Sequence, residues 1–132
     1  MRHNLFSYSK NNKVTFYQDG PEYYETYLNL IKNAKKSIHL QTYIFMMDEF
    51  GNEVQTELIK AAQRNIQIYV LVDYIGSRLM SFNSEEKFRQ AGIHFERFNN
   101  FQLKWLFSWG RRLHHKILLV DQRSEEHTSE LQ

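Results

Sequence analysis

Apolar residues along the first 121 positions of the chain alternate between two spacings, one typical of helices and one typical of strands. Tyr24, Tyr27, Leu28 and Ile31 recur with the three- and four-residue spacing of an amphipathic helix. Residues 66–72 (IQIYVLV) form a nearly continuous apolar run, which is typical of a strand buried inside a parallel sheet. The pattern therefore predicts a chain in which helices and strands alternate.

The predicted elements follow one another in the order β-α-β-α-β-α-β-loop-β. Strands are expected over 13–18, 37–45, 66–72, 93–98 and 114–120. Helices are expected over 21–34, over about 52–64, and from a cap at Asn83 or Ser84 to Gly92. This alternation predicts an α/β sandwich with a mixed, mostly parallel sheet flanked by helices.

The composition narrows the class of protein. Hydrophobic residues make up 42% of the 132 residues and aromatic residues 15%, which indicates a globular domain rather than a disordered segment. The chain has no cysteine, so disulfide bonds, zinc–thiolate sites and cysteine nucleophiles are excluded. No apolar run reaches the roughly 18–20 residues of a membrane span or forms a signal peptide, so we expect a soluble or peripheral protein.

The last ten residues, 123–132 (RSEEHTSELQ), differ from the rest of the chain. They begin where the strand pattern stops, and they resemble the in-frame translation of a short-read sequencing adapter. We therefore expect a non-native tail at 123–132, after an N-terminal extension at 1–11 and one domain at 12–122 that the tail cuts short. Without the tail, which holds one Arg and three Glu, 16 basic residues face 12 acidic ones, a mild excess that suits an anionic partner.

The candidate chemistry is concentrated in residues 114–121 (HHKILLVD), which have the pattern His-x-Lys-x4-Asp. In a regular strand His114 and Lys116 would share a face, about 7 Å apart. An imidazole can attack phosphorus, and a neighbouring ammonium can neutralise the charge that develops on the nonbridging oxygens. Asp121 has the opposite parity and would point away from the imidazole, so we expect it to have a structural role. The alternative is that two histidines and a lysine simply begin an apolar strand.

Several further segments agree with one known family. They are SIHLQTYIF at 37–45, Asp48 with Gly51, LVDYIGS at 71–77, AGI at 91–93 and RLHHK at 112–116. On these residues the chain resembles the cardiolipin synthase branch of the phospholipase D superfamily from about Asn12 to Asp121. The resemblance implies the phospholipase D-like α/β fold, of which 12–122 would be one catalytic half-domain, truncated before a second His-x-Lys-x4-Asp motif.

The resemblance also implies a reaction. In this family each of two halves gives one His and one Lys to a shared site. One histidine forms a phosphohistidine, and the other protonates the leaving alcohol, generally with no metal or other cofactor. The implied catalytic-motif residues are His114, Lys116 and Asp121, with His114 as the favoured nucleophile. Because the second half-site is absent, the isolated chain is expected to be inactive.

Two further groups of residues are candidates for contacts with substrate or membrane. Gln41 and Tyr43 share a strand face, and Asp73 and Ser77 lie at a strand end, where α/β folds bind ligands; ordinary structural positions are the alternative for all four. The loop 101–112 (FQLKWLFSWGRR) interleaves aromatic and basic side chains, which suits a membrane interface, unless it packs against protein. Its expected membrane contacts are Trp105, Phe107, Trp109, Arg111 and Arg112.

Three functions are compatible with these residues. The first is cardiolipin synthesis, in which a phosphatidyl group passes from a phosphatidylglycerol-like lipid to another lipid at the cytoplasmic face of the cell membrane. The second is hydrolysis on the same scaffold, by a phospholipase, a phosphodiesterase or a single-motif nuclease that dimerises. The third is a catalytically dead binding module. The aromatic loop favours lipid, and the small net charge does not favour nucleic acid as a partner.

Overall fold

Each helix begins at a side chain that caps it. The N-cap oxygens of Asp19, Asp48 and Ser81 accept hydrogen bonds of 3.0, 2.8 and 3.2 Å from N–H groups of the first turn. Such a cap satisfies a donor that has no partner within the helix. The predicted cap at Asn83 or Ser84 is therefore wrong, because Ser81 begins this helix earlier.

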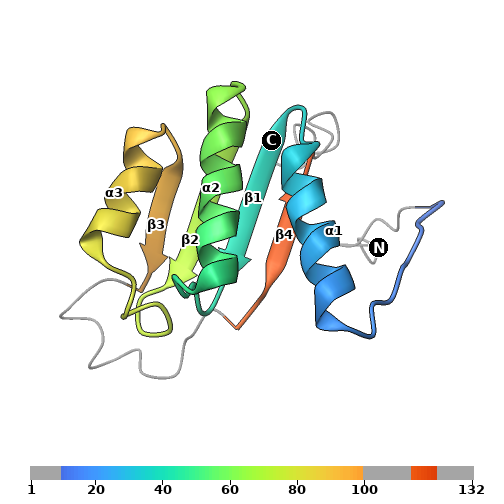
Figure 1. Ribbon diagram of the computed structural model, residues 1–132, viewed down its shortest axis with the longest axis horizontal. Coiled ribbons are helices and arrows are strands. Elements are labelled where there is room, and N and C mark those ends of the chain that lie inside the picture. The colour runs from blue at the N-terminus through green and yellow to red at the C-terminus, as the bar shows by residue number, and fades with distance from the viewer. Residues whose placement is uncertain (1–9, 100–113, 122–132) are drawn as a thin grey trace, which may run out of the picture.

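The computed structural model describes residues 10–99 and 114–121, and Figure 1 shows their helices and strands. The elements are α1 (Gly20–Lys32), β1 (Ser37–Thr42), α2 (Glu49–Gln63), β2 (Gln67–Asp73), α3 (Phe82–Gln90), β3 (His94–Phe98) and β4 (Ile117–Val120). Gly92 follows α3 with a φ of +81°, which a glycine adopts without strain, so the predicted C-terminal glycine is confirmed.

The four strands form one sheet in the order β3-β2-β1-β4. The first three are parallel, and β4 runs antiparallel to β1 at the edge of the sheet. The predicted α/β class with a mixed, mostly parallel sheet is confirmed. Because parallel strands are joined by right-handed crossovers, α2 and α3 lie on one face of the sheet, and α1 joins them there (Figure 1).

The hydrophobic core lies between this face of the sheet and the three helices. Leu40 of β1 is aligned with Val70 of β2 on one side and with Leu118 of β4 on the other. Side chains alternate between the two faces of a strand, so every second residue of β1 is buried under the helices. The largest helix side chains in this core are Ile31, Leu58 and Phe88, all fully buried.

The opposite face of the sheet has a row of aromatic rings. Tyr69 of β2 stacks between His39 of β1 and His94 of β3, with ring centroids 4.8 Å apart on each side. The three residues are aligned in the parallel register, so strand pairing itself brings the rings together. Among the described residues, no helix covers this face (Figure 1).

Three predicted strands differ from the structure. The strand predicted over 37–45 ends at Thr42, so Tyr43 follows β1 rather than lying in it. Residues 13–18 are irregular, with Val14 72% and Phe16 89% exposed. A strand needs a neighbour to pair its backbone N–H and C=O groups, and none of the described strands pairs with this segment. The last strand begins at Ile117, so His114 and Lys116 precede β4 rather than lying in it.

Two phenylalanines of α3 test this description of the core. Phe88 is fully buried whereas Phe82 is 73% exposed. Phe88→Ala is expected to lower the free energy of unfolding by about 3–5 kcal/mol, because it leaves a cavity. Phe82→Ala should change it by less than about 0.5 kcal/mol. Urea denaturation of both variants measures the difference, and equal effects would contradict the assigned packing.

Candidate functional site

The candidate site lies where β1 and β2 end and β4 begins. Because β4 is antiparallel to β1, its first residue, Ile117, is paired with Gln41 near the end of β1. The residues just before β4 therefore lie beside the residues just after β1. This strand pairing brings the motif residues to the carboxyl ends of the parallel strands, where α/β folds bind ligands.

An aromatic contact holds His114 at this end of the sheet. Its imidazole stacks on the ring of Tyr43, with centroids 5.2 Å apart and planes inclined by 20°. Tyr43 directly follows β1, and Gln41 lies two positions earlier, half-buried, within the strand. The structure thus brings together Tyr43 and His114, which the sequence indicated through separate patterns.

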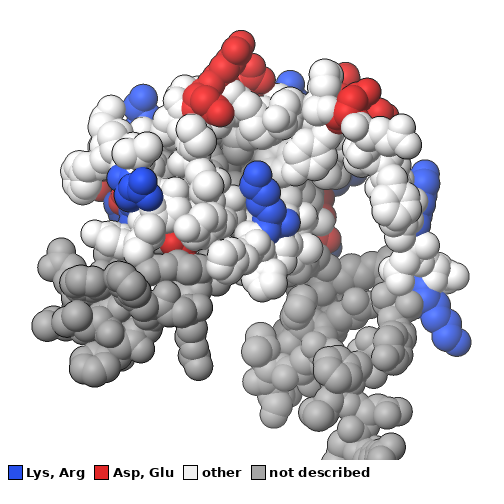
Figure 2. All heavy atoms as spheres, turned by 90° about the horizontal axis from the view of Figure 1, so that it is seen from below, with Lys and Arg blue, Asp and Glu red and all other residues white. Residues whose placement is uncertain are grey.

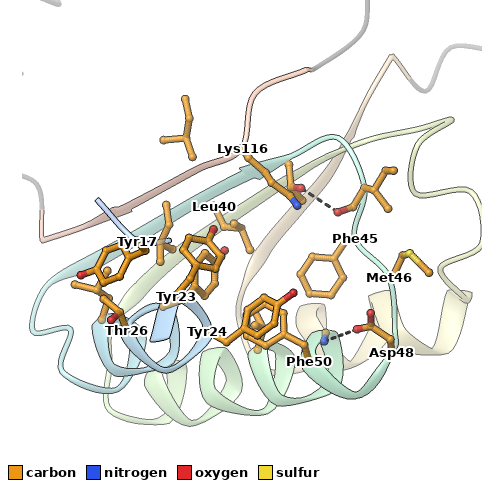
Figure 3. Close-up of a pocket in the computed structure, with 18 residues that line it drawn as sticks. Tyr17, Tyr23, Tyr24, Thr26, Leu40, Phe45, Met46, Asp48, Phe50 and Lys116 are labelled. Carbon is orange, nitrogen blue, oxygen red and sulfur yellow. Dashed lines mark hydrogen bonds between the residues drawn. The ribbon is translucent and has the colours of Figure 1, made fainter. Parts of the chain in front are cut away.

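Lys116 lines an apolar groove of about 510 Å³ that lies between strands β1 and β4 on one side and helices α1 and α2 on the other. Figure 3 shows its side chain pointing into this groove, toward Phe45. Other walls of the groove are aromatic. The ring centroid of Phe50 lies 4.3 Å from that of Tyr24 and 5.7 Å from that of Tyr27. Burial, together with the neighbouring Tyr23, raises the pKa of the Tyr27 phenol, so this phenol stays neutral.

Asp121 lies at the other end of β4 from His114, and its carboxylate binds the backbone at the start of β1. It accepts hydrogen bonds from the N–H groups of Lys36 at 2.6 Å, Lys35 at 2.9 Å and Ser37 at 3.2 Å. Its own N–H donates to the Ser37 carbonyl at 2.8 Å. Partial burial raises the pKa of this carboxyl, but the hydrogen bonds and the charge of Lys35 outweigh it, so the pKa lies below its ordinary value.

Asp73, the last residue of β2, and Ser77, in the loop that follows, are both buried. Asp73 accepts hydrogen bonds of 3.0 Å from the N–H groups of Ile75 and Gly76. The Ser77 hydroxyl is bonded to the backbone on both sides of Ile44. These contacts favour a structural role over the predicted contact with substrate.

The predicted membrane contacts, Trp105, Phe107, Trp109, Arg111 and Arg112, lie outside the described residues. Within the described part of the chain, no helix is long and apolar enough to cross a membrane. Across 10–99 and 114–121, no three His, Asp or Glu side chains converge as ligands for a metal ion.

The sequence analysis missed two groups of residues around the site. The helical spacing of Tyr24 and Tyr27 showed which face of α1 is apolar, but it did not show that α1 leaves space beside β4. Arg97 of β3 donates hydrogen bonds to the carbonyls of Ser77 at 3.0 Å and Met80 at 3.1 Å, and thereby holds the loop after β2. No local pattern marked Arg97, because its partners are 17 and 20 residues earlier.

Comparison with known sequences identifies the family. A sequence model described as "Cardiolipin synthase, PLD-like domain" matches residues 27–129. The chain belongs to this family. The predicted resemblance to the cardiolipin synthase branch of the phospholipase D superfamily is therefore confirmed.

Individual relatives of this phospholipase D-like chain agree. "Cardiolipin synthase 2" of Staphylococcus epidermidis is 35% identical over 112 residues, which cover 84% of this chain and 23% of the relative. "Major cardiolipin synthase ClsA" of Bacillus subtilis is 33% identical over 115 residues, which cover 86% of this chain and 24% of the relative. The chain thus spans about a quarter of the length of these relatives.

A solved structure has the same fold as this phospholipase D-like chain. It is Nuc of Salmonella typhimurium, described as a phospholipase D family member, with a TM-score of 0.53 and 22% identity. The match covers 74% of this chain and 56% of that one. It supports the α/β arrangement described above.

Asp121→Asn is expected to lower the free energy of unfolding above about pH 4, the ordinary pKa of an unfolded Asp. Because the carboxyl pKa is lowered in the folded chain, the ionised form stabilises the fold fully above the unfolded value. That stabilisation is lost as the pH falls through the folded pKa. Chemical denaturation at a series of pH values should therefore show a difference between variant and parent that shrinks in acid. A difference that is the same at about pH 7 and about pH 2 would contradict this role.

Proposed function

We propose that this domain is part of an enzyme that makes cardiolipin by transferring a phosphatidyl group between two phospholipids. The strongest support is the position of the motif residues relative to the groove. Lys116 lines an apolar groove, and His114 lies two residues earlier at the same end of the sheet. A phosphate beside both residues would leave its hydrocarbon chain next to the apolar walls.

The residues of the groove suit a lipid more than a soluble phosphate ester. Among the described residues that line it, Lys116 is the one cation. The start of α2 is less suited to phosphate, because Asp48 already accepts the N–H of Gly51 at 2.8 Å. Leu40 and Phe45 would contact hydrocarbon, and each buried CH₂ group contributes about 0.8 kcal/mol.

The proposed reaction has two steps. The imidazole of one motif histidine, His114 in our assignment, attacks phosphorus, and a phosphorus–nitrogen bond replaces the bond to glycerol. The histidine of a second motif gives its proton to the departing glycerol, while Lys116 neutralises charge on the phosphate oxygens. A hydroxyl of a second phosphatidylglycerol then displaces the histidine, returning its own proton to the second histidine. The products are cardiolipin and glycerol.

The proposal places the protein on the cytoplasmic face of the cell membrane, with an anionic phospholipid as its substrate. Trp105, Phe107, Trp109, Arg111 and Arg112 would contact the head groups. Figure 2 views the molecule from the end at which β1 to β3 finish, and the described Lys and Arg side chains lie scattered there. A nonspecific nuclease would need a continuous basic surface along its substrate, and the scatter of basic side chains among the described residues favours lipid instead.

Substitutions in the motif test this function in the protein expressed from its complete reading frame. With vesicles of phosphatidylglycerol as substrate, His114→Asn is expected to lower the rate of cardiolipin formation by about 1,000-fold or more. Lys116→Ala should lower it by about 100-fold, the cost of removing one group that stabilises developing charge. His115→Ala is the matched control, because this neighbouring imidazole has no assigned role, and it should have a far smaller effect.

The products separate the alternatives. Phosphatidic acid in place of cardiolipin would identify a hydrolase on the same scaffold. A His114→Asn variant that forms cardiolipin at nearly the parent rate would show that the assignment of His114 is wrong. A parent protein that alters no phospholipid would contradict the proposed function altogether.

A further inference from the structure

The loop after β2 is fastened to the residues after β1 by one buried hydroxyl. Ser77 is 2% exposed, and its Oγ accepts a hydrogen bond of 2.8 Å from the N–H of Phe45. The same hydroxyl donates to the carbonyl of Tyr43 at 3.2 Å. Because donor and acceptor functions are both used, the hydroxyl fixes the backbone on both sides of Ile44.

Gly76 makes this contact close. A Cβ added at Gly76 would collide with the carbonyl oxygen of Tyr43 and would lie 3.0 Å from Cδ2 of the Tyr43 ring. The absence of a side chain at Gly76 therefore lets the loop backbone pack directly against Tyr43. Any larger residue would have to displace either the loop or the ring.

The loop after β2 is hydrogen-bonded on two sides, which restricts its motion and lets it support Tyr43. Asp73 accepts the N–H groups of Ile75 and Gly76, as described above. On the other side, Arg97 donates hydrogen bonds to loop carbonyls. Its charge is balanced by an ion pair with Glu85, and Arg97 Nε donates a hydrogen bond of 2.6 Å to the Glu85 carboxylate. Both side chains of this pair are largely buried, which restricts their motion.

We infer that Gly76 and Ser77 are positioning residues that hold Tyr43 so that its ring orients the imidazole of His114. His114 precedes β4, outside the hydrogen-bonded part of the sheet, and its ring lies against Tyr43. A displacement of the Tyr43 backbone would therefore move the surface on which the imidazole rests. The role in orientation is structural, and its consequence for catalysis rests on the proposed function of His114.

The nuclear magnetic resonance signals of the His114 ring test this inference in the 132-residue chain, without any need for activity. The stacked Tyr43 ring is expected to shift the His114 ring-proton resonances, and Tyr43→Leu should abolish that shift. Gly76→Ala and Ser77→Ala are each expected to move the His114 resonances by at least half of the change caused by Tyr43→Leu. Disappearance of the His114 signals in His114→Asn assigns them in a histidine-labelled sample.

Matched controls separate positioning from general destabilisation. Tyr43→Phe keeps the ring and should leave the His114 resonances in place. Gly20→Ala adds a Cβ that has only ordinary contacts, and Ser84→Ala removes a hydroxyl of α3 whose hydrogen bond is to Ser81 rather than to the residues after β1. Both should leave the His114 signals unchanged. The amide spectrum of each variant shows whether it is folded.

Two results would overturn the inference. One is a folded Ser77→Ala or Gly76→Ala variant whose His114 resonances match the parent. The other is a Tyr43→Leu variant that leaves those resonances unchanged. If Gly76→Ala does not fold, Ser77→Ala decides the question, and if neither folds, the His114 resonances of Arg97→Lys decide it by the same criterion.

Activity provides a separate readout in the protein from the complete reading frame. Ser77→Ala should lower kcat about 10- to 100-fold, since a misplacement of about 1 Å can cost about 100-fold, while KM changes little. Loss of the stacking shift in a protein that makes no cardiolipin would leave this inference standing and contradict only the proposed function. An unchanged kcat beside a lost shift would overturn the catalytic consequence.

Discussion

The antiparallel pairing of β4 with β1 is the interaction on which the candidate site depends. It joins segments about 80 residues apart in sequence, so its contacts must offset the entropy of closing a long loop. Four residue pairs join β4 to β1, and at the far end of β4 the backbone N–H groups of residues 35–37 also donate hydrogen bonds to Asp121. With that end held, the residues before β4 must emerge beside the end of β1, where Tyr43 lies.

The rest of the site follows from the layers on either side of this pairing. On the helix side, α1 and α2 leave a groove lined by aromatic rings, and Lys116 lines it. Beside β1, the loop after β2 packs against Tyr43 through a glycine and a buried serine. The imidazole of the motif thus stacks on Tyr43 whereas the Lys116 side chain lines the groove, although only one residue separates them. Substitutions can therefore disturb one without the other.

Much of the fold could be predicted because buried residues recur at regular spacings along the sequence. The apolar run of β2 and the capped helices are local features, and the motif at 114–121 is a local pattern. The strand predicted at 13–18 was wrong because alternation shows only that a strand is possible, whereas pairing requires a neighbour. The stacking of Tyr43 on His114 and the contacts of Arg97 with the loop after β2 join residues distant in sequence. They depend on strand order and register, which no local pattern specifies.

The central claim is that strand pairing delivers His114 to Tyr43, and nuclear Overhauser contacts measure it most directly. Cross-peaks are expected between the ring protons of His114 and Tyr43, together with backbone cross-peaks between Gln41 and Ile117 in the same sample. A folded chain that shows the Gln41–Ile117 contacts but no contact between the two rings would contradict the site. A chain in which β4 pairs with β1 in another register would contradict the constraint on which the whole account rests.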